Sequence, residues 1–362
     1  ISAVGGRGEL GGCPMALEIL VIRLRELGDT LLTTPLLRQL RRLHPQARIS
    51  VLCQTANACV MEHNPHVDEL IMLPRQASAG EFLRIAARLR QRHYDLVVDA
   101  QSLPKTALIA RLTGGQQRLG YRKPGWRNRL CYTHPYRERV GEYSARQHLR
   151  LLQDDRIDLE DIGLDFPIND ETSSAADAFC RTYLRPPVAA VFGVSRFGYR
   201  MWPVKKMAAV ADRLARLGMQ PWLVYGPGQE EAAHQIASQM RHPALVDYEM
   251  PSFATLRAVF SQCALFFGND GGPKHVAVAA GIPTVTVSEA EHAHVWSPPG
   301  TPRHRVACTR AKRSESALAG TFTHTDRIAE IPVDAAWKEI AAALRQPAHQ
   351  GSLRHSPLMR AA

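Results

Sequence analysis

The stretch LEILVIRLRELGDTLLTTPLLRQLRRL at residues 17–43 decides the fold. Residues 17–24 are almost continuously apolar, which is typical of a strand buried on both faces of a sheet. After a turn at 26–29, leucines recur at helical spacing with arginines on the opposite side, and Pro45 ends the expected helix. A buried strand that leads directly into an amphipathic helix is the unit from which parallel α/β sheets are built.

The same alternation continues along the chain and starts again after an Asp-, Ser- and Pro-rich segment. We therefore expect an α/β fold with two domains in tandem. The expected strands lie at 17–24, 48–52, 70–73, 96–99, 188–192, 221–225, 264–267 and 284–287, and the expected helices at 31–43, 81–92, 204–217, 230–240, 274–280 and 337–344.

The domain boundaries follow from these changes of pattern. The first domain is expected at 15–170, the linker at 171–187 and the second domain at 188–330. A terminal helix is expected at 331–345. The Gly-rich segment 1–14 and the tail 346–362 show no apolar periodicity, so we expect both to be disordered.

Basic charge is the unusual feature of the composition. The 362 residues carry 45 Lys and Arg against 34 Asp and Glu, a formal charge of +11. Eleven basic residues lie between Lys105 and Arg150, opposed only by Glu138 and Glu142. Such an excess indicates an anionic partner (nucleic acid, a membrane surface or a phosphorylated substrate) or a solvated basic surface. No apolar run reaches the roughly 18–20 residues of a membrane helix.

The seven cysteines form no CxxC pair, which favours a reducing compartment over a disulfide framework or a zinc site. Residues 289–294, Glu-Ala-Glu-His-Ala-His, have the composition of a metal site. Their spacing matches no standard zinc motif, so we expect a loop at a substrate site or at the surface, and no metal.

The turn Phe266–His275 (FFGNDGGPKH) is the most informative candidate site. An apolar strand enters Asn-Asp-Gly-Gly, and Pro273 suits the first position of a helix. Glycines let the backbone approach a ligand, and the free N–H groups of a first helical turn attract phosphate. The sequence favours an anion site here, with a plain turn capped by Asp270 as the alternative.

Two other turns carry carboxylates. Asp29 follows Gly28 after the first strand and is either a helix cap or a general base. Glu230 follows Gly226-Pro227-Gly228 and is either a residue of a first helical turn or a receptor for ribose hydroxyls. Neither glycine cluster matches GxGxxG or GxxxxGK[ST], which disfavours a dinucleotide-binding fold and a P-loop ATPase.

Taken in order, these segments resemble the heptosyltransferases of glycosyltransferase family 9, over roughly residues 17–344. The Asn-Asp-Gly-Gly-Pro-Lys-His turn is similar to the family's Asn-Asp-Ser-Gly-Pro-x-His signature, and RMWP to its basic-x-Trp-Pro element. The segments that carry the resemblance are ILVIRLRELGDTLLTTPLLRQLR (19–41), NPHVDELIML (64–73), YDLVVDAQSLPKTALIARLTGGQQRLGYR (94–122), RMWP (200–203) and GNDGGPKHVAVAAGIPTV (268–285).

The resemblance implies a GT-B fold: two Rossmann-like domains with parallel sheets facing a central cleft, the last helix returning to the first domain. The N-terminal domain would bind the acceptor and the C-terminal domain the nucleotide sugar. It implies an inverting, metal-independent transfer from ADP-L-glycero-β-D-manno-heptose to the inner core of lipopolysaccharide, with no cofactor. The acceptor would be an anionic glycolipid of the Kdo-lipid A type, met by peripheral contact at the cytoplasmic face of the inner membrane.

The resemblance also implies roles for single residues. Asp29 would be the base that deprotonates the acceptor hydroxyl. Arg200 and Ser195 would face the diphosphate, Glu230 the ADP ribose and Asp270 the donor sugar. Gly271, Gly272 and His275 would form the phosphate-binding turn, and Lys274 would reach the diphosphate or point to solvent. Lys105, Arg122 and Lys123 are the candidates for acceptor binding.

The sequence departs from the family pattern at four places. Gly271 stands where Ser or Thr is usual, Lys274 where an apolar or small residue is common, and Arg200 where Lys is often found. Residues 288–294 stand where a Phe-Gly turn is usual. These departures keep other hypotheses open: a family relative with another nucleotide sugar or another glycan or protein acceptor, or a non-catalytic nucleotide-sugar binder. A nucleic-acid-binding protein is disfavoured because no RNA or DNA motif and no series of stacking aromatics is present.

Overall fold

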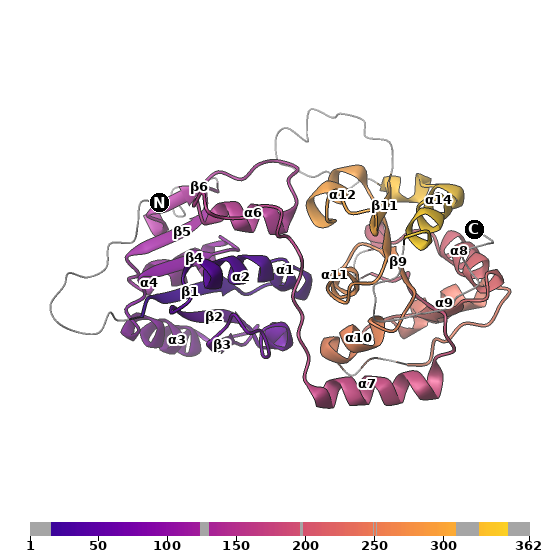
Figure 1. Cartoon of the computed structure of the whole chain (residues 1–362), viewed down its shortest axis with the longest axis horizontal. Helices are drawn as coiled ribbons and strands as arrows, with labels where there is room; N and C mark the ends of the chain where they lie inside the picture. Colours follow the sequence, from indigo (N-terminus) through magenta and orange to yellow (C-terminus); the bar gives the residue numbers. More distant parts are fainter. Residues whose placement is uncertain are drawn as a thin grey trace. The chain divides into compact units, whose positions relative to one another are not determined.

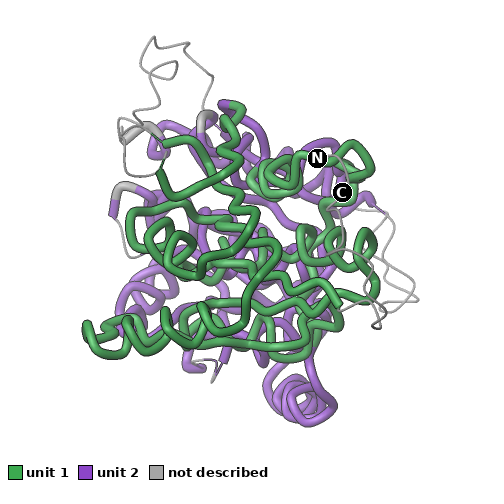
Figure 2. Tube along the Cα trace, turned by 90° about the vertical axis from the view of Figure 1, so that its left-hand side faces the viewer, with its two compact units in different colours: residues 1–139, 144–167 green, residues 140–143, 168–362 purple. Residues whose placement is uncertain are grey.

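The computed structural model describes residues 16–123, 130–195, 198–248, 250, 252–308 and 326–346. The chain divides into two compact units, one of residues 1–139 and 144–167 and the other of residues 140–143 and 168–362 (Figure 2). The expected extension at 1–14 and all but the first residue of the expected tail at 346–362 lie outside the described residues.

Unit 1 is built on a parallel sheet of six strands with the order β3-β2-β1-β4-β5-β6 (Figure 1). The strand order reverses at β1, which pairs with β2 on one side and β4 on the other. Ligands of open α/β sheets bind beyond the carboxyl ends of the strands at such a reversal. The elements are β1 Glu18–Arg23, α1 Leu27–Leu31, α2 Thr34–Leu43, β2 Arg48–Gln54, η1 Thr55–Val60, β3 Glu69–Leu73, α3 Ala79–Gln91, β4 Leu96–Asp99, α4 Pro104–Leu112, β5 Gln117–Tyr121, β6 His134–Tyr136 and α6 Ser144–Leu151.

Unit 2 is built on a parallel sheet of five strands with the order β11-β10-β9-β7-β8. Every residue of β7, β9 and β10 is buried, and β7 and β9 are accordingly mostly apolar in sequence, whereas β10 alternates valine with threonine and serine. The elements are α7 Asp170–Tyr183, β7 Val188–Phe192, η2 Gly198–Arg200, α8 Val204–Arg216, β8 Gln220–Leu223, α9 Glu230–Ser238, α10 Phe253–Phe260, β9 Leu265–Asn269, α11 Gly272–Ala279, β10 Thr284–Ser288, α12 Ala290–Trp296, β11 His304–Cys308, η3 Asp326–Glu330 and α14 Val333–Leu344.

Close packing of the central strands depends on Gly268 in β9. A Cβ atom at this position would lie 2.2 Å from the carbonyl oxygen of Phe192 at the end of β7. No side chain fits there, so glycine is required where β7 and β9 pair near their carboxyl ends.

The terminal helix α14 belongs to unit 2, where it packs against β10, β11 and α8 (Figure 1). Its apolar face buries Ala336, Ile340 and Ala343, and Arg305 of β11 donates to Glu339 at 2.6 Å. That this helix also returns to the first domain stays a prediction. Within the described residues, no helix is long and apolar enough to cross a membrane.

Candidate functional site

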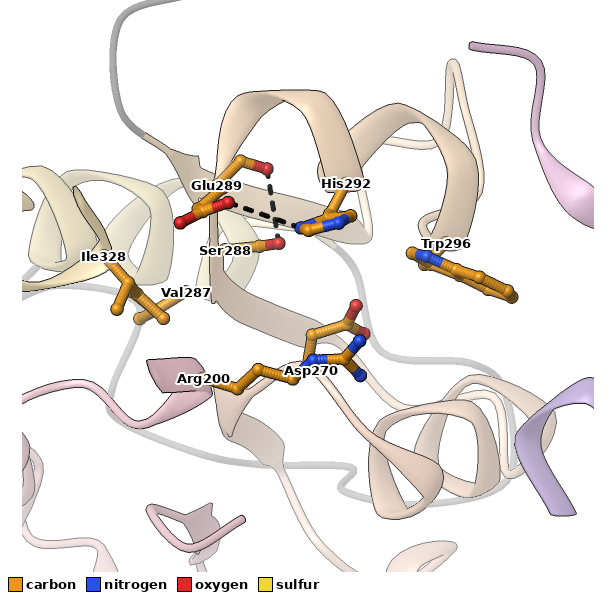
Figure 3. A pocket seen from close by; sticks show the side chains of 8 residues that line it. All are labelled: Arg200, Asp270, Val287, Ser288, Glu289, His292, Trp296 and Ile328. Carbon is orange, nitrogen blue, oxygen red and sulfur yellow. Dashed lines mark hydrogen bonds and ion pairs between the residues drawn. The ribbon is translucent and has the colours of Figure 1, made fainter. Parts of the chain in front are cut away.

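A pocket in unit 2 lies beyond the carboxyl ends of β9 and β10. Figure 3 shows Arg200 and Asp270 on one side of it, with Glu289 and His292 across the pocket. Its empty volume is about 380 Å³, part of which is open to solvent. The lining residues are Arg200, Asp270, Val287, Ser288, Glu289, His292, Trp296 and Ile328.

The end of β9 sets the position of the polar groups on the first side. Asn269 is the last strand residue and is fully buried, and its Oδ1 accepts a hydrogen bond from the backbone N of Trp202 at 3.0 Å. The Trp202 indole donates to the carbonyl of Ile331 at 3.1 Å. The Trp-Pro element is thus fixed to the β9 turn, which brings Arg200 and Asp270 to the same pocket.

Asp270 and Lys274 form an ion pair on the first turn of α11. The Lys274 Nζ lies 2.5 Å from Asp270 Oδ1 and donates to the carbonyl of Trp296 at 2.6 Å. The Lys274 side chain is 1% exposed and the Asp270 side chain 20% exposed. Burial by itself would raise the pKa of Asp270, but Lys274, His275 and Arg200 hold that pKa below its ordinary value.

His275 follows on the same helix and is buried behind the pocket. Its ring stands edge-on to that of Trp296, with 6.4 Å between centroids. Burial, assisted by the Lys274 charge, lowers the pKa of His275 to about 3, so its imidazole is neutral at physiological pH. Its Nδ1 has no hydrogen-bond partner among the described residues.

The far wall of the pocket is formed by Ser288 at the end of β10 and by α12. Glu289 precedes this helix, and its Oε2 lies 3.5 Å from the Nδ1 of His292 (Figure 3). Residues 290–296 form helix α12, so the expectation of a loop at 289–294 is wrong. In the part of the chain that the structure describes, no group of three or more His, Cys, Asp or Glu side chains is arranged to hold a metal ion.

Unit 1 carries its own carboxylate beyond the strand at which the sheet order reverses. Asp29 lies in the first turn of α1, and its Oδ2 is 2.8 Å from Nη2 of Arg23, the last residue of β1. Arg23 Nη1 also donates to the carbonyl of Ala100, beyond the end of β4, at 2.5 Å. Glu26, not Asp29, occupies the N-cap position, so the simple capping alternative for Asp29 is not what the geometry shows.

Comparison with known proteins decides the family. The model of glycosyltransferase family 9 (heptosyltransferase) matches residues 82–319, which is more than half of the chain. The chain belongs to glycosyltransferase family 9. The matched range contains every residue that lines the pocket except Ile328, whereas Asp29 lies before it.

Individual relatives of this family 9 glycosyltransferase agree with the assignment. Lipopolysaccharide heptosyltransferase 3 of Escherichia coli is 25% identical over 75% of this chain and 83% of its own length. A family 9 glycosyltransferase of Veillonella parvula superposes with a TM-score of 0.80 at 24% identity, covering 91% of this chain and 97% of that one. The E. coli ADP-heptose lipopolysaccharide heptosyltransferase II superposes with a TM-score of 0.72 at 21% identity, covering 91% and 98%. The predicted GT-B fold is confirmed.

Of the donor-site residues predicted for this glycosyltransferase, some line the pocket and others lie elsewhere in unit 2. Arg200 and Asp270 line the pocket, and Gly271 and Gly272 form the entry to α11 beside it. Ser195 lies half-buried beyond β7. Glu230 lies in the first turn of α9 with 66% of its side chain exposed, and its Oε1 is 3.9 Å from the His234 Nε2.

Lys274 and His275 differ from their expected orientations. Lys274 neither points to solvent nor lies among the residues that line the pocket, because its ammonium is engaged by Asp270 and Trp296. His275 is likewise buried behind this wall. The i, i+4 spacing of Asp270 and Lys274 was the signal in the sequence that could have revealed the ion pair.

The three acceptor candidates lie in unit 1. Lys105 is exposed at the start of α4, with its Nζ 5.9 Å from the centroid of the Phe82 ring. Arg122 is exposed directly after β5. Lys123 is half-buried, forms an ion pair with Glu138 and lies over the ring of Tyr121.

The sequence did not predict a group of buried polar side chains at the carboxyl ends of β4 and β5. The Tyr132 hydroxyl donates to Asp99 Oδ2 at 2.7 Å, and the Tyr121 hydroxyl lies 2.6 Å from His148 Nδ1. Burial raises the pKa of Asp99 and lowers that of His148. Arg23, which ends an otherwise apolar strand, was the charged residue in the sequence that could have drawn attention to this region.

Proposed function

We propose that this chain is an inverting heptosyltransferase that moves a heptose from ADP-heptose to the inner core of lipopolysaccharide, on an acceptor of the Kdo-lipid A type. The observation that carries this proposal is the pocket of unit 2, where Arg200 and Asp270 meet at the ends of the central strands. A guanidinium suits a diphosphate, and a carboxylate suits sugar hydroxyls.

On the donor side, the departing ADP carries the charge that develops during transfer. Arg200, Ser195 and the first backbone N–H groups of α11 at Gly271 and Gly272 would stabilise that charge, without a metal ion or a cofactor. Asp270 would orient the heptose, and Glu230 would accept hydrogen bonds from the ribose hydroxyls. The exposure of Glu230 leaves it accessible to such a ligand.

On the acceptor side, Asp29 would take the proton from the attacking hydroxyl as that oxygen bonds to the anomeric carbon and the ADP leaves. A general base of this kind contributes about 10²–10⁴-fold to the rate. The ion pair with Arg23 fixes the direction of the Asp29 carboxylate.

Lys105, Arg122 and Lys123 would meet the anionic acceptor. Each basic residue near an anionic membrane contributes about 1 kcal/mol, so several together would favour peripheral binding at the cytoplasmic face of the inner membrane. Arg122 and Lys105 are exposed, as this role requires.

A second candidate is transfer of another sugar, or transfer to a different glycan or protein. The far wall of the pocket supports this second candidate, because Glu289 and His292 introduce a carboxylate and an imidazole where the family pattern has a Phe-Gly turn. These side chains would contact the part of the donor farthest from Arg200.

The test is an activity screen that crosses several nucleotide sugars with several acceptors. We expect turnover with ADP-heptose on Kdo-lipid A. Turnover with a different pair alone would establish the second candidate, and donor binding without any turnover would establish a non-catalytic binder. Salt-sensitive binding to RNA but not to lipopolysaccharide-core mimics would support a nucleic-acid-binding protein instead.

A further inference from the structure

The ammonium of Lys274 joins two walls of the pocket without facing the pocket itself. One of its contacts is Asp270 Oδ1, on the turn between β9 and α11, and the other is the carbonyl of Trp296, the last residue of α12. Both partners line the pocket. A cation at the C-terminal carbonyl of a helix is also favourably placed in the field of that helix.

This geometry separates Lys274 from an ordinary ligand-binding lysine. A phosphate-binding lysine presents its ammonium to the ligand as a point charge. The Lys274 side chain is 1% exposed, and two of the three hydrogens of its ammonium are directed at protein oxygens. The carboxylate that it holds keeps a fifth of its surface exposed and lines the pocket.

We propose that Lys274 is a positioning residue for donor recognition, which orients the Asp270 carboxylate toward the sugar and holds the end of α12 against it. The proposal rests on the proposed function, because it assigns the sugar part of the donor to Asp270. Lys274 acts through Asp270 and Trp296 and makes no contact with the diphosphate. It therefore contributes to recognition of the transferred sugar and not of the nucleotide.

Removal of Lys274 has two physical consequences. Asp270 loses the cation that opposes its burial, so its carboxylate is free to turn toward water. The Trp296 carbonyl loses its charged donor, so the end of α12 is held only by its packing. Both changes weaken contacts to the sugar and leave Arg200 in place.

The experiment compares the binding of ADP with that of ADP-heptose, by calorimetry on the full chain. The variant is Lys274→Met, and the matched control is Lys338→Met, the same change at an exposed lysine of α14. For Lys274→Met we expect the Kd of ADP-heptose to rise about tenfold or more and that of ADP to change by less than about twofold. Lys338→Met leaves both unchanged.

Asp270→Asn and the double variant Asp270→Asn/Lys274→Met show whether Lys274 acts through Asp270. We expect the double variant to bind ADP-heptose as weakly as Asp270→Asn alone, because the two residues form one unit. Removing both charges leaves no buried carboxylate without its cation and so restores part of the thermal stability that Lys274→Met loses, which keeps a folded protein available for the comparison. Additive losses of affinity in the double variant would overturn the proposal.

Two other results would overturn it. Equal losses of ADP and ADP-heptose affinity in Lys274→Met would mean that Lys274 binds the diphosphate or supports the fold in general. Unchanged affinity for ADP-heptose would mean that the ion pair has no part in recognition.

Failure of the proposed function gives a different result. A wild-type chain that binds neither ADP nor ADP-heptose contradicts the proposed donor and with it the sugar-recognition role. The link to α12 is then measured by hydrogen exchange: faster exchange of the α12 amides in Lys274→Met than in Lys338→Met supports the link, and equal exchange rejects it.

Discussion

The two units each place a carboxylate in or just before the first turn of a helix that follows a central strand, and each pairs it with a cation. In unit 1 the pair is Asp29 with Arg23, and in unit 2 it is Asp270 with Lys274. The carboxylates are almost equally exposed, at 21% and 20% of the side chain. In both pairs the cation also donates to a backbone carbonyl from another element.

The pairs differ in where the cation comes from. Arg23 ends the strand that precedes the carboxylate, and its second contact, Ala100, follows the neighbouring strand. Lys274 lies on the helix after the carboxylate, and its second contact is a helix end that lines a pocket. The first arrangement ties a carboxylate on helix α1 to the sheet, which would suit the proposed base, and the second links a carboxylate to another wall of the pocket.

The largest expected effect comes from neutralising the carboxylate of unit 1. We expect Asp29→Asn to lower kcat by about 10²–10⁴-fold, because an amide cannot accept the proton of the acceptor hydroxyl. Donor affinity, a property of unit 2, is expected to stay the same. Steady-state kinetics and calorimetry measure the two quantities.

The matched control is Glu62→Gln, which makes the same chemical change at an exposed residue of unit 1. An Asp29→Asn enzyme with wild-type kcat would remove the assignment of Asp29 as base and, with it, the difference in role between the two pairs.

Acid is expected to weaken both units. His275 in unit 2 has a pKa of about 3 in the folded chain against 6.5 unfolded, so below pH 6.5 the unfolded chain takes up a proton that the folded chain does not. The contribution of His275 to the free energy of unfolding is fully present above pH 6.5 and declines by about 1.4 kcal/mol per pH unit as the pH falls toward 3. His148 in unit 1, whose pKa is also lowered by burial, has the same sign.

Hydrogen exchange resolved by segment, measured in urea between pH 4.5 and 7, separates the two units. His275→Asn is expected to flatten the pH dependence of unit 2 only, and His148→Asn that of unit 1 only. The exposed His63→Gln is the control. A slope that the His275 substitution leaves unaltered would show that this histidine is protonated in the folded chain.

A smaller effect is expected from the cation of the first pair. Arg23→Met leaves Asp29 without its guanidinium partner, and we expect kcat to fall about tenfold with little change in donor Kd. Arg25→Met is the control, because Arg25 lies two residues further along and is exposed. An increase confined to the donor Kd would show that Arg23 acts on the donor and not on the acceptor side, and would contradict this prediction.

The smallest expected effect is at Gly271, where the family pattern has a hydroxyl. Its φ of 171° is extended, and an added Cβ would lie 3.2 Å from the Cε1 atom of the Phe192 ring, so Gly271→Ser requires a small shift of that ring. We expect thermal stability to change little and donor KM to fall a few-fold. Gly268→Ser gives the contrast, because its Cβ would meet the Phe192 carbonyl at 2.2 Å and the fold of unit 2 would be lost. A destabilised Gly271→Ser would show that the ring cannot move.

The sequence was sufficient for strands β1–β4 and β7–β10 and for singling out the carboxylates Asp29 and Asp270, since an apolar strand followed by a turn with glycine and aspartate is a local pattern. It missed the edge strands β5, β6 and β11. The partners of these carboxylates were missed. Arg23 is hidden at the end of an apolar run, and the Trp296 carbonyl lies 22 residues from Lys274. Contacts of this kind depend on how elements pack, which no local pattern encodes.

Helices α12 and α14 show further features that depend on packing and that the sequence did not predict. Residues 289–294 were expected to form a loop, yet the structure has helix α12 there, packed beside β11. The period of α14 predicted a helix but not the sheet that its apolar face covers.

The contact between Trp202 and Ile331 has a consequence for the order of synthesis. All residues of unit 1 have left the ribosome once residue 167 emerges, so its sheet can form while the rest of the chain is being made. The pocket of unit 2 needs Ile328 for its lining and the Ile331 carbonyl to fix the Trp-Pro element. The pocket of unit 2 is therefore among the last features of the molecule to be assembled, and a nascent chain that stops before residue 328 would have one folded domain and an incomplete pocket.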